Sequence, residues 1–137
     1  MDGRLERYVP VAGRLMLSAI FILSGPRKTV DWDFYSGYMA SQDMPAVPFF
    51  LVMAILFELT GGLMVLAGYR ARLGAFLLIV FLVPTTLIFH DFWSAPVDQQ
   101  QNQMIHFMKN VSILGGLLMV LGLGAGGLSF DGRRRTH

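Results

Sequence analysis

Four long apolar runs, separated by short polar segments, dominate the pattern of hydrophobic and polar positions along the chain. They cover residues 9–25, 46–68, 73–93 and 104–124. A helix needs roughly 20 mostly apolar residues to cross a bilayer core of about 30 Å, and each run approaches or exceeds that length. The pattern therefore predicts an all-α integral membrane protein, a bundle of four spanning helices. A cleaved signal peptide is the alternative for the first run, although the segment SGPRK is a poor cleavage site.

The two longer connections differ in character from the tight turn between the second and third runs. Residues 26–45 mix Trp32, Tyr35 and Tyr38 with acidic residues. This mixture predicts a short amphipathic helix in the membrane interface between spans one and two, with a functional lid as the alternative. Residues 94–103 are rich in Gln and are predicted to form a polar loop.

The distribution of basic residues predicts the orientation of the spans, because Lys and Arg near span ends favour the cytoplasmic side. One side of the predicted bundle carries seven of them: Arg4, Arg7, Arg70, Arg72, Arg133, Arg134 and Arg135. The other side carries only Arg27 and Lys28, together with several aspartates. We therefore expect a multi-pass protein of the cell membrane with both termini in the cytoplasm and a basic cytoplasmic tail over residues 125–137.

The composition agrees with a single membrane domain over residues 1–137. Hydrophobic residues make up 54% of the chain and charged residues only 15%, too few for an ordinary soluble surface. The absence of cysteine excludes a disulfide scaffold and thiolate chemistry. The net charge is only +2 and no domain-scale basic patch is present, so we expect the lipid bilayer and no nucleic acid as a partner.

Several ionisable residues lie inside the predicted spans, where each costs about 3 kcal/mol or more at the bilayer centre unless it finds a partner. Glu58 lies near the middle of the second span, Arg14 lies in the first, and Lys109 lies in the fourth. Judged by depth alone, Glu58 falls between Arg14 and Lys109. One carboxylate between two cations leaves a positive charge over, which would attract an anion or a quinone carbonyl. A structural ion pair or a protonated packing carboxyl is the alternative for Glu58.

Further polar residues cluster toward the outer half of the third and fourth spans. His106, Lys109 and Asn110 share one helical face, while His90 and Asp91 lie at the outer end of the third span. Asp91 would either orient an imidazole or pair with Lys28, and we place Lys28 at the rim of the polar pocket described next. We thus predict an outer-half polar pocket. It is formed by Arg14, Glu58, His90, Asp91, His106, Lys109 and Asn110. A Lys109 side chain that extends to the headgroups, and a merely capping role for His90 and Asp91, are the simpler alternatives.

The sequence contains no motif of a known soluble catalytic site and assigns no catalytic residue. His90 and His106 are two imidazoles without a nearby ligand spacing such as ExxH, so we expect no metal site and no covalent cofactor.

Five segments in this order resemble the DoxX family of small four-helix membrane proteins. They are GRLMLSAIFILSGPRK, YMASQDMP, FELTGGLMVLAGYRARLGA, TLIFHDFW and QMIHFMKNVSILGGLL. The resemblance covers nearly the whole chain and implies a four-span fold. It also implies an association with quinol oxidase or thiosulfate:quinone oxidoreductase systems. The chain departs from the family pattern by inserting Pro26 and Arg27 between Gly25 and Lys28, and the absence of cysteine removes any thiol relay.

These observations together predict a membrane subunit that binds quinone or a small redox substrate in the outer-half pocket. Because the chain has no electron carrier of its own, this role requires a partner protein subunit or a homo-oligomer, or a bound quinone as the reactive centre. A scaffold or accessory protein that recruits a partner enzyme is the first alternative. A transporter element built as an oligomer is the second.

Overall fold

A computed structural model describes residues 3–134, and these form six α-helices and no strand. The helices are α1 Gly3–Val30, α2 Trp32–Ser41, α3 Val47–Ala67, α4 Ala71–Phe89, α5 Val97–Leu123 and α6 Phe130–Arg134. Four of them, α1, α3, α4 and α5, are long and apolar enough to cross a membrane. The prediction of an all-α bundle with four spans is therefore confirmed.

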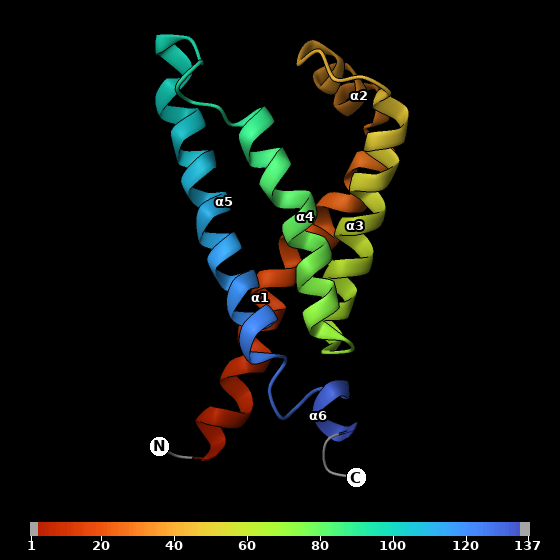
Figure 1. The fold of residues 1–137 in the computed structure, drawn as a ribbon, viewed down its shortest axis with the longest axis vertical. Helices are drawn as coiled ribbons and strands as arrows, with labels where there is room; N and C mark the ends of the chain where they lie inside the picture. The colour runs from red at the N-terminus through yellow and green to blue at the C-terminus, as the bar shows by residue number, and fades with distance from the viewer. Residues whose placement is uncertain (1–2, 135–137) are drawn as a thin grey trace.

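The four long helices are packed in sequence order, with α1 against α3, α3 against α4, and α4 against α5. Figure 1 shows α1 crossing diagonally behind the other three, and α2 lying at the end of the bundle opposite to both chain termini. The termini lie together at the other end, as an even number of spans requires. The structure thus has a terminal end, with α6 and the α3–α4 turn, and an opposite end, with α2 and the α4–α5 connection.

Three predicted boundaries differ from the observed ones. α1 continues through Pro26 to Val30, and α4 ends at Phe89, so that His90 lies outside the helix. α5 begins at Val97, so most of the predicted polar loop over residues 94–103 is helical. Pro96 occupies the N-cap position and the glutamines that follow are good helix formers, which explains the earlier start.

The predicted amphipathic helix between spans one and two is present as α2, but it is shorter than residues 26–45. Its Met39 is buried, whereas Phe34 is 70% exposed. The hydroxyl of Tyr38 donates a hydrogen bond to the carbonyl oxygen of Phe89 at 3.3 Å, which links α2 to the end of α4. α2 is therefore attached to the bundle by packing and by one polar contact.

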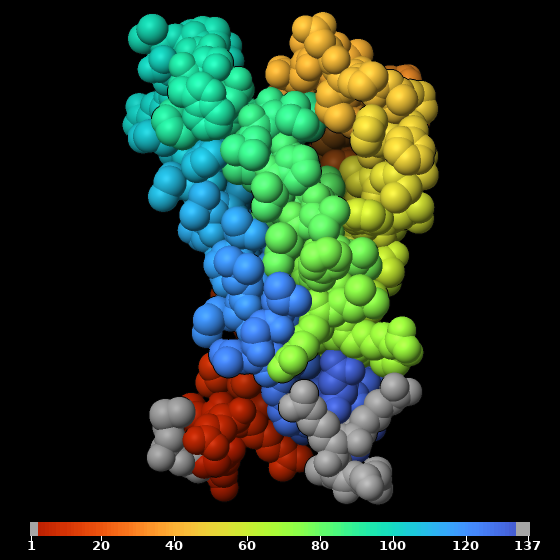
Figure 2. All heavy atoms as spheres, in the orientation of Figure 1, coloured from red at the N-terminus to blue at the C-terminus, as the bar shows by residue number. Residues whose placement is uncertain are grey.

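The buried core draws on all four spanning helices. Its central members are Phe21, Val65, Ala75, Leu78, Leu82 and Leu117. Many other large apolar side chains lie on the outside of the bundle, including Met16 at 75% and Leu23 at 73% exposure. Such an outer surface is suited to lipid rather than to water. The space-filling view shows α3, α4 and α5 side by side on the near face (Figure 2).

The segment after α5 folds back on the terminal end. Asp131 accepts hydrogen bonds from the backbone N–H groups of Arg70 and Ala71, both at 2.8 Å, and its own N–H donates to the carbonyl oxygen of Gly68. Asp131 thereby caps the first turn of α4 from a distant part of the chain. The sequence analysis treated residues 125–137 only as a basic tail; its Arg135 lies outside the described residues.

α3 and α4 approach each other most closely at two glycines. A Cβ at Gly61 would lie 2.9 Å from the carbonyl oxygen of Gly74, and a Cβ at Gly74 would lie 2.7 Å from the Cβ of Met64 and 3.0 Å from the carbonyl oxygen of Gly61. We expect Gly61→Ala and Gly74→Ala each to lower the free energy of unfolding by about 1–3 kcal/mol, the usual cost of overpacking. Gly115→Ala is the matched control, since no atom lies within 4 Å of that position. Thermal unfolding in detergent, followed by circular dichroism, measures the difference; equal losses at all three positions would contradict the close approach.

The orientation of the bundle in the membrane stays a prediction that labelling can test. The chain contains no cysteine, so single cysteines can be introduced on a clean background. We expect Gln101→Cys to react with a membrane-impermeant maleimide added outside intact spheroplasts, and Arg133→Cys to react only after the membrane is opened. The reverse pattern would place the termini outside.

Candidate functional site

The polar residues of the spans form separate groups instead of one pocket. Lys28 and Glu58 form the first group, Arg14 belongs to a second at the terminal end, and His90 and His106 form a third at the opposite end. The predicted pocket, which placed all of them together in the outer half, is therefore divided. Each group has its own geometry and its own capacity to bind a ligand.

Glu58 is paired with Lys28, which the sequence analysis placed only at the rim. The Lys28 Nζ lies 2.8 Å from Glu58 Oε2 and 3.0 Å from Oε1, and it donates a third hydrogen bond to Ser24 Oγ at 2.6 Å. The Glu58 side chain is 3% exposed and that of Lys28 is 14% exposed. All three N–H donors of the ammonium have acceptors, so this ion pair is saturated.

Two aromatic rings complete the surroundings of the Lys28 ammonium. Its Nζ lies 5.3 Å from the ring centroid of Tyr35 on α2 and 5.8 Å from that of Phe81 on α4. Cation–π contacts of this kind stabilise a desolvated cation. The Lys28–Glu58 pair thus joins groups from α1, α2, α3 and α4 at one point.

Glu58 pairs with neither Arg14 nor Lys109, the two partners suggested from depth along the spans, because the first span was predicted to end at Gly25. Once α1 continues past Pro26, Lys28 lies one helical turn beyond Ser24 on the same face and reaches the carboxylate directly. No unpaired positive charge remains beside Glu58 to attract an anion.

Arg14 is buried at the terminal end and holds the C-terminal segment. It is 4% exposed, and its Nη2 donates to the carbonyl oxygen of Leu128 at 2.6 Å. Asp131 is the carboxylate that interacts electrostatically with it, and Nε and Nη1 have no hydrogen-bond partner among residues 3–134. Arg14 therefore connects α1 to the segment before α6 and does not belong to the outer half.

His90 and His106 stack on each other across the ends of α4 and α5. Their ring centroids are 5.1 Å apart and the planes are inclined by 21°. His90 Nδ1 lies 2.9 Å from Gln103 Oε1, and His106 Nδ1 lies 3.4 Å from Lys109 Nζ. The structure therefore brings together two predicted residues of adjacent spans and adds Gln103, which the sequence analysis did not select.

The partners of the two rings define which nitrogen carries the proton. The amide oxygen of Gln103 can only accept, so its contact is a hydrogen bond in the His90 tautomer that carries the proton on Nδ1 and leaves Nε2 as an acceptor. The ammonium of Lys109 can only donate, so its contact favours the His106 tautomer that accepts at Nδ1 and carries the proton on Nε2. The stacked pair thus offers one acceptor and one donor, and both rings are half-buried.

The remaining predicted residues take different positions. Asn110 is buried, and its Nδ2 donates a hydrogen bond to Thr86 Oγ1 at 3.0 Å. The Thr86 hydroxyl in turn donates to the carbonyl oxygen of Leu82, so Asn110 links α5 to α4. Lys109 is exposed on the outside of α5 apart from its contact with His106. The pairing suggested between Asp91 and Lys28 is not observed, and Gln103 takes the place beside the His90 imidazole that Asp91 was expected to fill.

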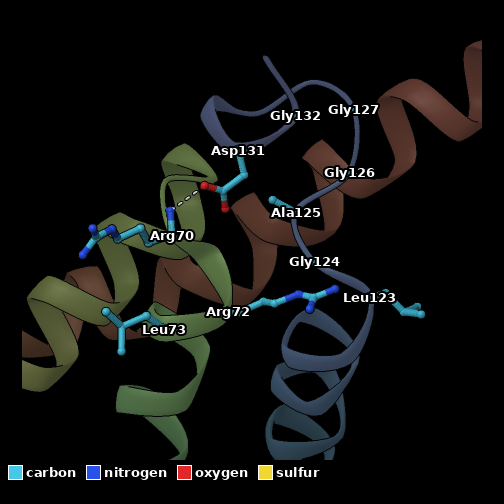
Figure 3. A pocket seen from close by; sticks show the side chains of 10 residues that line it. All are labelled: Arg70, Arg72, Leu73, Leu123, Gly124, Ala125, Gly126, Gly127, Asp131 and Gly132. Carbon is cyan, nitrogen blue, oxygen red and sulfur yellow. Dashed lines mark hydrogen bonds between the residues drawn. The ribbon is translucent and has the colours of Figure 1, made fainter. Parts of the chain in front are cut away.

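An open groove lies at the terminal end, far from the histidines. It measures about 820 Å³ and is bounded by the α3–α4 turn, the end of α5 and the glycine-rich segment that follows (Figure 3). Within residues 3–134, no three His, Asp or Glu side chains are grouped as ligands for a metal ion.

Three residues that build these groups were missed, and they differ in whether a signal was available. Ser24 is visible in the sequence as the residue one turn before Lys28, provided that the helix is continued through Pro26. Gln103 was assigned to a loop, which hid its place one turn from His106 on α5. Asp131 has no local signal, because its partners lie 60 and 61 residues away.

The comparisons with known proteins agree on the type of protein. A family model described as DoxX matches residues 9–91. The Escherichia coli inner membrane protein YphA is 32% identical over 96% of this chain and 94% of its own length, and YqjF of the same organism is 30% identical over 93% of each. No solved structure matches the chain significantly.

A eukaryotic relative is much longer. The Surfeit locus protein 4 homolog of Drosophila melanogaster is 26% identical over 98% of this chain but over only 44% of its own length. The present chain is therefore similar to a part of that protein.

Because the Lys28–Glu58 pair is buried, we expect the two single substitutions together to lower the free energy of unfolding by more than the double substitution does. We expect Glu58→Gln or Lys28→Met alone to lower the free energy of unfolding by about 3–5 kcal/mol, since each leaves an uncompensated charge or unmatched donors. The double variant should lose less than the sum of the two. Reversible unfolding in mixed detergent micelles measures this cycle; strictly additive losses would show that the two groups are not coupled.

Proposed function

This chain belongs to the DoxX family, and on that premise we propose that it binds the head group of a quinone or quinol, or of a small redox substrate with the same oxygen chemistry. The binding position is the stacked pair of His90 and His106. The observation that carries the proposal is the pair of contacts from Gln103 to His90 and from Lys109 to His106, which favours opposite tautomers and so an acceptor beside a donor.

The donor set fits such a head group. A quinone carbonyl accepts a hydrogen bond and is matched by His106 Nε2, whereas a quinol hydroxyl donates one and is matched by His90 Nε2. Imidazoles also exchange protons near neutral pH, so the pair can take up or release the protons that accompany quinol chemistry. Lys109 and Gln103 act as positioning residues, since they fix which ring nitrogen is protonated.

The neighbouring aromatic residues suit a flat apolar ring. Phe92 and Trp93, which follow His90 closely in the chain, and Phe107, which follows His106 on α5, contact one another edge to face at centroid distances of 5.3 to 5.8 Å. Trp93 is 56% exposed and is typical of a membrane-interface residue. A ligand at this position keeps its polar oxygens on the histidines and its hydrophobic tail in the lipid.

A bound quinone would supply the two-electron carrier that the chain lacks, and the electron donor or acceptor would be a partner subunit. The Lys28–Glu58 pair does not take part in this proposal. Its donors are saturated, so it serves to hold α1, α2, α3 and α4 together.

A ligand-free accessory subunit is the second candidate. It is favoured by the saturation of the Lys28–Glu58 pair and by the structural contacts of Arg14 and Asn110, which assign most of the intramembrane polar groups to stabilisation. In this case the exposed Lys109 would face a partner helix.

Quinone binding separates the two candidates. We expect the purified protein in detergent to bind one short-chain quinone analogue per chain, detected by quenching of tryptophan fluorescence and by calorimetry. His106→Phe should raise the Kd by about tenfold or more, the loss of about one hydrogen bond. Gln103→Ala should have a smaller effect in the same direction, since it frees His90 to adopt the other tautomer.

Gln101→Ala is the matched control, because Gln101 is an exposed glutamine on the same turn of α5 without a contact to either ring. It should bind the analogue like the original chain. If the folded protein shows no saturable binding, the quinone proposal is wrong and the accessory subunit is favoured.

A further inference from the structure

The groove at the terminal end is amphipathic, and neither the ion pair nor the histidine pair uses it. Arg70 and Arg72 line it from the α3–α4 turn, and Leu73 and Leu123 line it from the ends of α4 and α5. The segment 124–127 forms its remaining wall. In Figure 3, Arg72 extends toward the end of α5, while Arg70 projects from the other side of the turn.

The groove carries donor capacity that the fold does not consume. No hydrogen bond or ion pair within residues 3–134 engages the side chain of Arg70, which is exposed. Arg72 uses one nitrogen, Nη2, to donate to the carbonyl oxygen of Gly122 at 3.1 Å, which leaves its other N–H groups available. Asp131 is the carboxylate of the groove, and both its oxygens already accept backbone N–H groups at 2.8 Å.

The glycine-rich wall adds backbone donors. Within the described part of the chain, the N–H groups of Ala125, Gly126 and Gly127 make no hydrogen bond to another backbone or side-chain group. Gly124 and Gly126 adopt positive φ angles of 88° and 82°, which glycine permits without strain. Backbone N–H groups that make no hydrogen bond, next to two guanidinium groups, are suited to bind a phosphate group.

The apolar part of the groove indicates an amphipathic ligand rather than a wholly polar one. Leu123 is 72% exposed at the last residue of α5 and Leu73 is 44% exposed in the first turn of α4. Both leucines lie at the ends of spanning helices, close to the arginines. In a membrane, the arginines would therefore lie at the level of the headgroups and the leucines at the level of the acyl chains.

We propose that this groove binds one anionic phospholipid, with its phosphate on Arg72 and the amides of residues 125–127, Arg70 at the rim, and an acyl chain along Leu73 and Leu123. If the terminal end faces the cytoplasm, as the basic residues predict, the site meets the leaflet whose anionic lipids attract arginine. The bound lipid joins the α3–α4 turn to the segment that Asp131 and Arg14 hold.

Native mass spectrometry of the detergent-released protein tests this site. With phosphatidylglycerol we expect one retained lipid per chain, and with phosphatidylcholine of the same acyl chains clearly less. Arg70→Gln with Arg72→Gln should reduce retention of phosphatidylglycerol by about fivefold for each arginine. Arg7→Gln is the matched control, since it removes the same charge from the same end of the bundle outside the groove.

Several outcomes would overturn the proposal. Equal retention of both lipids, or an equal loss in Arg7→Gln, would show that only general surface charge is at work. Displacement of the lipid by a large excess of glycerol 3-phosphate would identify a site for soluble phosphates. If the double variant does not fold, the Arg70→Gln single variant is the test, because the Arg70 side chain makes no hydrogen bond or ion pair within residues 3–134. Unchanged retention of phosphatidylglycerol in that variant would argue against the site.

Discussion

A charge inside a membrane must find its partner within the protein, and in this chain that constraint is met by the ion pair of Lys28 and Glu58. The carboxylate lies in the middle of α3 and cannot reach water, so the ammonium comes to it from the end of α1. Ser24, Tyr35 and Phe81 then complete the coordination of that ammonium. The rest of the bundle depends on this pair because it fixes how α1, α2, α3 and α4 meet.

The polar groups at the two ends of the bundle differ in the partners that they have. At the terminal end, Arg14 and Asp131 bind backbone groups and fold the C-terminal segment against the α3–α4 turn. At the other end, His90 and His106 stack and keep one nitrogen each free of partners within the described residues. The saturated Lys28–Glu58 pair and the buried Arg14 stabilise the fold, whereas groups that are accessible and keep unused donors or acceptors can take a ligand. For this reason our proposals concern the histidine pair and the arginine groove and leave the ion pair to its structural role.

The comparisons place this architecture in a wider group of membrane proteins. The bacterial relatives YphA and YqjF match over more than nine tenths of both chains, so the four-span unit accounts for nearly the whole of each. The longer Drosophila relative matches with less than half of its length.

The sequence by itself determined the fold class, the four spans and the ionisable residues that needed a partner. Hydrophobic run length and the cost of charge in lipid are local quantities, and both can be calculated from a segment alone. The sequence analysis also selected His90 and His106, because polar residues near span ends are visible without a structure. The tertiary structure decided which charges meet. Depth along a span leaves the direction of a side chain around the helix axis open, so Glu58 was assigned to Arg14 or Lys109 until the continuation of α1 through Pro26 brought Lys28 to it. The cap that Asp131 provides for α4 was invisible for a related reason, since its partners lie about sixty residues away and only packing brings them together.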